Sequence, residues 1–397
     1  MINGLDEYKK KWQIQTDSAI KPGLEAIESA LAELDHPETK GTYIHIAGTN
    51  GKGSTSAFLA NILKAHGHSV GNFYSPAILD LHDQIQLDGI AATPQQMDRA
   101  MERLARVRTS LTDFELLTAA AFLIFEEAAP DFTIIEAGMG GRFDSTNVID
   151  PEIAIIPSVS LEHTVFLGDT LEKIAFHKAG IIKKWKPIIV GQLPAEALYI
   201  IEETAKSLHA DLIQPAEPLA LPLKQKGKHQ LWNARLAYEA AKELLGFSFD
   251  PAKAEMALVE TTVPFRFQEL YPDVILDGAH NEASIRALVD TVKKTYPDRE
   301  IHIVMGLMKD KDYQAILRLL EEISEHFTFV EFGYEKEISS KILFSQNRSK
   351  IKTIKTLYDI LPVPNKKEVT IVTGSLYFLS ALKNQDFHML QNFKNQP

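Results

Sequence analysis

A glycine-rich stretch between a short apolar segment and a helical pattern constrains this chain more than any other feature. Residues 43–47 read YIHIA, which is typical of a buried strand, and the next eight residues read GTNGKGST. A helical pattern runs from about Lys52 to His66 and ends at Gly67. A helix that begins directly after glycines offers unpaired backbone N–H groups and a partial positive charge, and both favour an anion. The order strand, loop, helix therefore predicts a phosphate-binding loop.

The side chains of this loop suit a nucleotide with a metal ion. Lys52 would reach the terminal phosphates, and Ser54 or Thr55 would offer a hydroxyl to Mg²⁺. The glycines that would let the backbone approach the anion are Gly48, Gly51 and Gly53. The common form of such a loop has an additional glycine where this chain has Ile46, so the loop is a shortened variant. The alternative is a glycine-rich turn with one solvated lysine.

Strands and helices alternate on both sides of this loop. Thr112 and Glu115 form a capping-box pattern that opens a helix through about Ala129. Apolar strands are expected at residues 131–138, 153–159 and 187–191. This alternation predicts an α/β fold with a mostly parallel, doubly wound sheet.

The alternating pattern pauses near residues 261–270, which we interpret as a link, and then restarts. The second series of strands lies in VILDGAH, IHIVMG, FTFVEF and EVTIVTGS, with a helix after each of the first three. We therefore expect two domains, 1–262 and 263–397, the second being a smaller α/β domain of a common size, roughly 130 residues. Since ligands of such sheets bind outside the carboxyl ends of strands, a cleft between the domains is the expected reaction site.

Composition excludes several classes of function. The chain has 42 Lys and Arg against 53 Asp and Glu, a net charge of −11, which argues against a nucleic-acid or anionic-membrane partner. It has no cysteine, which excludes disulfides, thiolate metal sites and thiol nucleophiles. The longest apolar run, residues 116–125, is short for a membrane span and is expected to be a buried helix. With no apolar signal segment at the amino terminus, we expect a cytoplasmic protein.

Other candidate residues follow the strands. Glu136 lies where an apolar strand ends, a position from which a carboxylate holds Mg²⁺ directly or through water. The alternative for Glu136 is a carboxylate with structural partners alone. The next residues, AGMGGRFDSTN, predict a flexible active-site loop. His163 and Lys178 are weak signals on their own.

Taken in order, a series of stretches resembles the folylpolyglutamate synthase/dihydrofolate synthase branch of the Mur ligase superfamily, from about residue 18 to 378. The stretches are AGTNGKGST, SPAILDLHDQIQLDG, FELLTAAAF, EAGMGGRFDSTNVI, LEHTVFLGDTLEKIAFHKAGI, HQLWNA, DGAHN, GLMKDKD and TGSLY. The resemblance implies an amino-terminal P-loop ATPase domain and a carboxy-terminal Rossmann-like domain.

The activity that the resemblance implies is an ATP-dependent amide ligase. Such an enzyme joins the α-amino group of L-glutamate to a carboxylate of dihydropteroate or a folate and releases ADP and phosphate. A carboxylate has a poor leaving group, so it is first converted to an acyl phosphate. During this transfer, lysine and Mg²⁺ stabilise the charge that spreads over the phosphoryl group. The implied partners are these small molecules, and the family precedent is a monomer.

The resemblance also implies roles for residues of the first domain. Ser75, Glu136 and His163 match positions that bind a second Mg²⁺, and Lys178 matches a lysine that is carbamylated. Carbamylation is consistent with electrostatics, because an unmodified lysine would be repelled by two Mg²⁺ ions. The residues that would hold the triphosphate and the first Mg²⁺, for which Ser54 is the ligand, are Asn50, Gly51, Lys52, Gly53, Ser54 and Thr55.

The remaining matched positions contact nucleotide and substrate. Gln230 and Asn233 match an adenine-contacting stretch, and Arg266 matches an arginine that reaches the phosphates. Asp277 and His280 match residues that face the nucleotide and the acyl phosphate. The position expected to hold the incoming glutamate is Ser375, and the residues expected to act in catalysis are Lys52, Lys178, Arg266 and His280.

Several positions depart from the family pattern. They are Ala77, the pair Asp83 and Gln84, Glu162, His177 and Phe265. The first departures lie near the expected pterin side and leave open whether dihydropteroate or tetrahydrofolate is the acceptor. The others lie near the metal or the link.

Three other functions are compatible with parts of the sequence. Another Mur-type ligase acting on a peptidoglycan precursor would have a UDP-binding domain before the loop, and none is recognisable. A P-loop kinase or NTPase switch leaves the second domain and DGAHN unexplained. A nucleotide-binding paralogue with an altered acceptor is the third, and it is motivated by the departures.

Overall fold

The computed structural model describes residues 4–17, 23–77, 80–360 and 367–383. The chain divides into two compact units, residues 1–223 with 231–261 and residues 224–230 with 262–397. The outer ends of the two expected domains, 1–3 and 384–397, lie outside the described residues. Among the described helices, none is long and apolar enough to cross a membrane.

The first unit is built on a sheet of strand order β10-β9-β8-β2-β7-β3-β4-β5. Its strands are β2 (Tyr43–Ile46), β3 (Val70–Phe73), β4 (Ile85–Leu87), β5 (Ile90–Ala91), β7 (Phe132–Glu136), β8 (Ile153–Ile156), β9 (Ile188–Val190) and β10 (Leu212–Ile213). Neighbouring strands from β10 to β3 are parallel, whereas β4 is antiparallel to both β3 and β5. The predicted mostly parallel sheet is confirmed.

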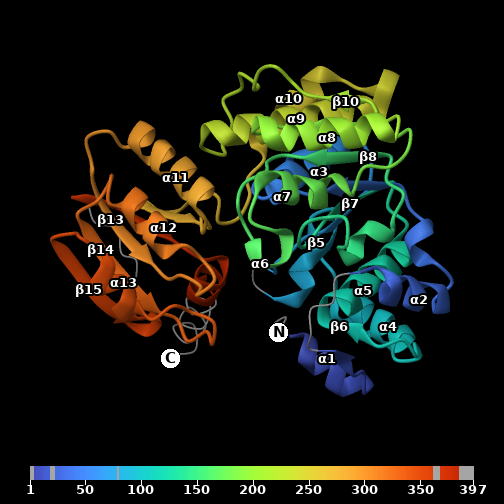
Figure 1. The fold of residues 1–397 in the computed structure, drawn as a ribbon, viewed down its shortest axis with the longest axis horizontal. Coiled ribbons are helices and arrows are strands. Elements are labelled where there is room, and N and C mark those ends of the chain that lie inside the picture. Colours follow the sequence, from blue (N-terminus) through green and yellow to red (C-terminus); the bar gives the residue numbers. More distant parts are fainter. Residues whose placement is uncertain (1–3, 18–22, 78–79, 361–366, 384–397) are drawn as a thin grey trace, which may run out of the picture. The chain divides into compact units, whose positions relative to one another are not determined.

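Helices cover both faces of this sheet (Figure 1). In β8, Ile153 and Ile155 pack in one apolar cluster with α3, α9 and α10, while Ala154 and Ile156 pack in another with α7 and α8. Alternate residues of a strand point to opposite faces, so this apolar run requires a layer of helices on each side. The helices are α3 (Lys52–Ala65), α5 (Asp113–Ala128), α7 (Leu171–Ala179), α8 (Ala195–Ser207), α9 (Lys228–Leu245) and α10 (Pro251–Glu260).

The expected helix after Thr112 is present as α5. Thr112 Oγ1 accepts a hydrogen bond from Glu115 N at 3.3 Å, and Glu115 Oε2 accepts one from Thr112 N at 2.7 Å, as a capping box requires. The apolar run 116–125 is buried within this helix, as predicted. The smaller elements of the unit are α1 (Leu5–Trp12), α2 (Glu25–Glu33), α4 (Pro94–Leu104), α6 (Thr164–Leu167), β1 (Thr16–Asp17) and β6 (Leu111–Thr112), with β1 parallel to β6.

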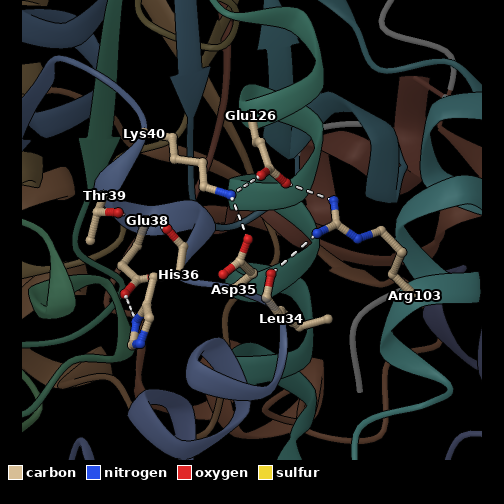
Figure 2. A network of polar contacts seen from close by, with 8 residues as sticks. All are labelled: Leu34, Asp35, His36, Glu38, Thr39, Lys40, Arg103 and Glu126. Carbon is tan, nitrogen blue, oxygen red and sulfur yellow. Dashed lines mark hydrogen bonds and ion pairs between the residues drawn. The ribbon is translucent and has the colours of Figure 1, made fainter.

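A polar network connects the carboxyl end of α5 with α4 and the segment after α2 (Figure 2). Glu126 Oε1 lies 2.5 Å from Lys40 Nζ, and Glu126 Oε2 lies 2.6 Å from Arg103 Nη1. Arg103 Nη2 also donates to the carbonyl oxygen of Leu34 at 3.2 Å. Glu126 is therefore the central acceptor of this network.

The second unit has a sheet of strand order β11-β12-β16-β13-β14-β15. Its strands are β11 (Gln268–Tyr271), β12 (Val274–Asp277), β13 (Glu300–Met305), β14 (His326–Glu331), β15 (Ile351–Thr356) and β16 (Glu368–Thr373), and its helices include α11 (Glu282–Thr295), α12 (Tyr313–Leu320) and α13 (Ser340–Gln346). One sheet face forms an apolar core with these helices. Short 3₁₀ turns of the whole chain lie at Pro37–Thr39, Leu81–Gln84, Ser145–Val148, Gly246–Ser248 and Leu357–Asp359.

One sequence expectation for this region needs correction, and one strand was not expected. The link expected at 261–270 is partly strand, because β11 pairs antiparallel with β12. The edge strand β15 was not predicted. Its sequence, IKTIKT, is mostly exposed, so it lacks the apolar run that marked the inner strands.

Candidate active site

The predicted phosphate loop connects β2 to α3 and is held from the side by the segment after β8. Asn50 N donates to Ser158 Oγ at 2.8 Å, and Ser158 Oγ donates to the carbonyl oxygen of Asn50 at 2.9 Å. Thr49 N donates to the carbonyl oxygen of Ser158 at 3.0 Å. Gly51 then caps α3 with a φ of 88°, a left-handed conformation that favours glycine. The loop therefore has a fixed shape and ends in a helix N-terminus.

Lys52 lies back along this loop. Its Nζ donates to the carbonyl oxygen of Gly48 at 3.0 Å and lies 3.7 Å from Glu136 Oε1. Glu136 is nearly buried, with 6% of its side chain exposed. The sheet explains the pairing, since Ile46 at the end of β2 is in register with Glu136 at the end of β7. The structure thus brings together the two charged residues predicted for this site.

Oxygen donors gather at the start of α3. Ser54 and Thr55 are both buried in the first turn, and Thr55 Oγ1 has no hydrogen-bond partner among the described residues. A Cβ on Gly53 would lie 3.6 Å from Glu136 Oε2, so the carboxylate faces this turn. Ser75 follows β3, which pairs with β7, and so lies at the same edge of the sheet. Hydroxyl and carboxylate oxygens are the donors that Mg²⁺ prefers, and this donor set fits the ion.

Lys178 lies in the last turn of α7 and is 3% exposed. Burial lowers its pKa from the usual 10.5 to about 7, and the positive charge of Lys52 acts in the same direction. The charges of Glu162 and Asp144 oppose this shift without cancelling it. A substantial fraction of the Lys178 amine is therefore uncharged at neutral pH.

The glycine-rich segment after β7, which the sequence predicts to be an active-site loop, makes several hydrogen bonds in the structure. Asp144 Oδ2 accepts from Met139 N at 2.7 Å, and its Oδ1 accepts from Thr146 Oγ1 at 2.6 Å. Arg142 N donates to the carbonyl oxygen of His177 at 2.7 Å, which attaches the segment to α7. A Cβ would meet the ring of Phe114 at Gly138, the side chain of Leu167 at Gly140, and the carbonyl oxygens of His177 and Lys178 at Gly141, so the packing leaves little room for a larger residue at these positions.

Two further predicted residues of the first unit flank the loop. A Cβ on Gly51 would lie 2.5 Å from Asn233 Oδ1, so Asn233 of α9 packs directly against the phosphate loop. His163 is exposed and has a φ of 51°, and its carbonyl oxygen accepts hydrogen bonds from Phe166 N and Leu167 N at the start of α6. Asn233 therefore lies against the nucleotide loop, and His163 comes three residues after Ser160, whose N–H donates to Thr49 Oγ1 of that loop at 3.0 Å.

A cavity that the sequence did not predict opens beside α6 and α7. Its volume is about 420 Å³. Its lining residues are Phe166, Leu167, Gly168, Glu172, Lys173, Phe176 and His177. Phe166 and Phe176 are 45% and 48% exposed, so two aromatic rings are left partly open to solvent. The sequence alone does not distinguish Phe166 and Phe176 from apolar residues that pack in the core, because their exposure depends on the fold.

The second unit contains the other predicted residues. Asp277, at the end of β12, accepts hydrogen bonds from Phe267 N at 2.8 Å and Ala279 N at 2.9 Å. Burial raises the pKa of Asp277, and the charge of Arg266 is the first of the effects that oppose the rise. His280 Nδ1 lies 2.8 Å from the carbonyl oxygen of Gly278.

Ser375 lies at the same edge of the second sheet. It follows β16, whose residue Thr373 is in register with Asp277 of β12. Ser375 is 2% exposed, and its Oγ accepts a hydrogen bond from Tyr377 N at 3.2 Å. Gln230, also buried, belongs to the segment 224–230 of this unit. The predicted residues are thus divided between the two units.

Comparison with known proteins matches both halves of the chain. Residues 46–208 match the family model described as the Mur ligase middle domain, and residues 266–376 match the Mur ligase glutamate ligase domain. A dihydrofolate synthase/folylpolyglutamate synthase of Bacillus subtilis is 35% identical over 92% of this chain and 95% of its own length.

Solved structures give the same result. E. coli FolC in complex with DHPP and ADP has a TM-score of 0.87 at 25% identity and covers 97% of this chain and 98% of its own. The Yersinia pestis bifunctional folylpolyglutamate synthase/dihydrofolate synthase, complexed with AMPPNP and a Mn ion, has a TM-score of 0.85 at 26% identity, covering 97% and 98%. The chain is similar to these proteins over nearly its whole length.

Proposed function

Because the chain belongs to the dihydrofolate synthase/folylpolyglutamate synthase family of Mur ligases, we propose that it uses ATP to join L-glutamate to dihydropteroate, to a folate, or to both. In this reaction a carboxylate oxygen of the acceptor attacks the γ-phosphorus of ATP, and ADP leaves. The α-amino nitrogen of glutamate then attacks the acyl carbon, phosphate leaves and an amide forms. The observation that carries the proposal is the Lys52–Glu136 pair at the phosphate loop, within a chain that matches both Mur ligase models.

Residues of the first unit are proposed to bind the nucleotide and the metal. Lys52, held over the loop by the carbonyl oxygen of Gly48, would exchange that contact for the terminal phosphates. The buried hydroxyl of Thr55, which finds no hydrogen-bond partner in the part of the chain that the structure describes, and the carboxylate of Glu136 support a magnesium site at the start of α3. The proposed ligands are Ser54 for a first ion and Ser75, Glu136 and His163 for a second. Bound Mg²⁺ would stabilise negative charge on the transferred phosphoryl group.

Lys178 is proposed to be carbamylated. Its uncharged amine, favoured by burial, would attack the carbon of CO₂, so that an N–C bond forms and one proton is released. The product is a carboxylate, which removes the repulsion between a lysine cation and the charge of Lys52 or a metal ion. The low pKa of Lys178 supports this step, because only the neutral amine is a nucleophile.

Residues of the second unit are proposed to bind glutamate and the acyl phosphate. Arg266 would contact phosphate, and Asp277, with both oxygens engaged by backbone N–H groups, would hold the turn that carries His280. Ser375 would contact the incoming glutamate. Gln230 and Asn233 would contact the adenine. The domain roles follow: ATP and acceptor in the first unit, glutamate in the second. We further propose that the enzyme acts as a cytoplasmic monomer, which sedimentation of the purified chain and cell fractionation would test.

The first experiment measures phosphate release with ATP, Mg²⁺ and L-glutamate, separately with dihydropteroate and with tetrahydrofolate. Turnover that requires both glutamate and a pterin acceptor supports the proposal, and the acceptor used names the activity. Phosphate release that is independent of either would contradict a ligase and favour an ATPase switch. No turnover with either acceptor would favour a paralogue with another substrate.

A pair of lysine variants tests the nucleotide loop. Lys52→Ala is expected to lower turnover by two orders of magnitude or more, because a donor aimed at transition-state charge is worth about 3–4 kcal/mol. Lys64→Ala is the control, since Lys64 lies on the same helix but is exposed and bonds the carbonyl oxygen of Asp88. Equal rates for the two variants would show that Lys52 does not contact the reacting phosphate.

A further inference from the structure

Two histidines and a glutamate from three neighbouring strands meet on one face of the second sheet. His302 of β13 is directly in register with His326 of β14, and their rings stack at 3.8 Å between centroids. Glu368, at the start of β16 on the other side of β13, pairs in register with Glu300, two residues before His302. Side chains two residues apart share a face, so the strand order brings all three side chains together.

The donor atoms of this cluster converge. His326 Nδ1 lies 3.0 Å from Glu368 Oε2, and His302 Nδ1 lies 3.9 Å from Glu368 Oε1. One ligand atom from each residue lies within 4.8 Å of the other two. Between 17% and 29% of each side chain is exposed, so an ion could enter from solvent without crossing the core.

We propose that His302, His326 and Glu368 form a binding site for a divalent transition-metal ion, with Zn²⁺ as the best fit. Two imidazoles and one carboxylate are a donor set that Zn²⁺ accepts, with a fourth position left for water, whereas Mg²⁺ prefers oxygen ligands. His326 and Glu368 begin their strands and His302 is the third residue of β13, whereas Asp277 ends β12 and Ser375 follows β16. The cluster therefore lies toward the opposite edge of the sheet from Asp277 and Ser375. It is therefore distinct from the proposed ligase residues of this unit.

A second layer of side chains already orients one ligand. His302 Nε2 lies 2.8 Å from Thr328 Oγ1, and Thr328 Oγ1 lies 3.1 Å from Thr353 Oγ1. When Nε2–H donates to Thr328, the lone pair of His302 is on Nδ1, the atom that faces Glu368. Metal-bound histidines are commonly fixed in this way through their other nitrogen.

Binding requires a small local rearrangement. Donors around a tetrahedral ion at about 2.1 Å lie about 3.4 Å apart. The His326–Glu368 pair, at 3.0 Å, is already within this spacing, whereas the His302–Glu368 pair, at 3.9 Å, would have to close slightly. The two rings, now nearly parallel at 6°, would tilt so that both Nδ1 lone pairs point at one ion. Rotation about the last side-chain bonds supplies this movement without changing the register of the strands.

Zn²⁺ titration of the full chain tests the site. The chain is stripped with a chelator and titrated calorimetrically with ZnCl₂ in excess Mg²⁺, which occupies oxygen-rich sites. We expect one Zn²⁺ per chain whose binding is lost in both His326→Gln and Glu368→Gln. His209→Asn is the matched control, because it removes an exposed imidazole of the first unit at a φ of 52° that asparagine accepts. Binding to the control should equal binding to the native chain.

A positioning variant and a stability readout complete the test. Thr328→Val is expected to weaken Zn²⁺ binding about 10- to 100-fold, since it removes only the partner of His302 Nε2. Zn²⁺ should raise the melting temperature of the native chain and not of Glu368→Gln, and far-UV circular dichroism should show that all metal-free variants are folded. Absence of Zn²⁺ binding in the native chain would overturn the proposal. Equal binding in the native chain and in both ligand variants would also overturn it.

Discussion

Lys178 provides the sharpest test of the proposed site, because its burial affects stability and chemistry together. Its pKa falls from 10.5 to about 7 in the folded chain, chiefly through burial. In the unfolded chain the amine returns to its ordinary pKa. Between about pH 7 and pH 10.5 the unfolded state therefore holds more protons than the folded state, and the free energy of unfolding rises with pH across this window.

The magnitude follows from the same values. Each pH unit of full difference in proton uptake is worth about 1.4 kcal/mol, which sets an upper bound of about 5 kcal/mol for the whole window. Between pH 7 and pH 9, where the folded amine is still partly protonated at the lower end, we expect a gain of about 2 kcal/mol. Lys178→Met keeps an unbranched side chain but has no proton to bind, so this contribution should disappear from the variant.

The assay is urea unfolding of both proteins in CO₂-free buffer at several pH values. Other groups also contribute to the pH dependence, including Lys183, whose pKa is lowered from its ordinary value by burial, and these contributions cancel in the difference between native chain and variant. Lys183→Met is the control and should retain most of the native slope. A Lys178→Met variant whose unfolding free energy changes with pH as steeply as that of the native chain would refute the reasoning, because Lys178 would then be charged when folded.

The same proteins test carbamylation directly. With ¹³C-labelled bicarbonate, the native chain and Lys183→Met should show a carbamate carbon signal by NMR, and Lys178→Met should not. Lys178→Met should also lose ligase turnover. A fully active native enzyme with no carbamate signal would remove the modification from the mechanism while leaving the low pKa of Lys178 intact.

Two other perturbations have expected outcomes. Gly51→Ala should lower ATP affinity and turnover at least tenfold, because its Cβ would lie 2.5 Å from Asn233 Oδ1. Gly67→Ala shares the positive φ, but no atom of the described residues lies within 4 Å of its Cβ, so this control should cost only about 1–2 kcal/mol of stability and leave kinetics unchanged. Equal kinetics for the two would contradict the close packing of the loop. Burial raises the pKa of Glu126, but the hydrogen bonds from Lys40 and Arg103 outweigh it, so the net pKa is lowered. Glu126→Gln should therefore cost about 1 kcal/mol of unfolding free energy at pH 7, measured by urea unfolding. This stability difference should vanish as the pH falls below about 4.5, because the carboxyl is protonated first in the unfolded chain and then in the folded chain. A difference that persists unchanged at low pH would mean that the charge of Glu126 does not contribute to stability.

Much of the fold could be predicted because local signals agreed with the tertiary structure. The strand–loop–helix unit at β2 and α3 and the capping box of α5 are both encoded within a few residues. Apolar strands that are covered on both faces are equally predictable, because they form continuous apolar runs. The exposed edge strand β15 could not be predicted this way, because its solvent-facing residues carry no apolar pattern. The antiparallel strand β11 was missed because Pro264 and its neighbours suggest a link.

The sites differ in how far the sequence could reach them. Lys52 and Glu136 were predictable because Lys52 follows β2 and Glu136 ends β7, and neighbouring parallel strands end at a common edge. His302, His326 and Glu368 lie 24 and 42 residues apart along the chain and carry no spacing motif. Their meeting depends on the strand order β16-β13-β14 and on a register that puts His302 opposite His326. A shift of either strand by one residue would turn its histidine into the helix-covered core. The register is fixed by that core, in which Ile303 pairs with Phe327, so the packing that stabilises one face of the sheet also creates the metal-binding geometry on the other.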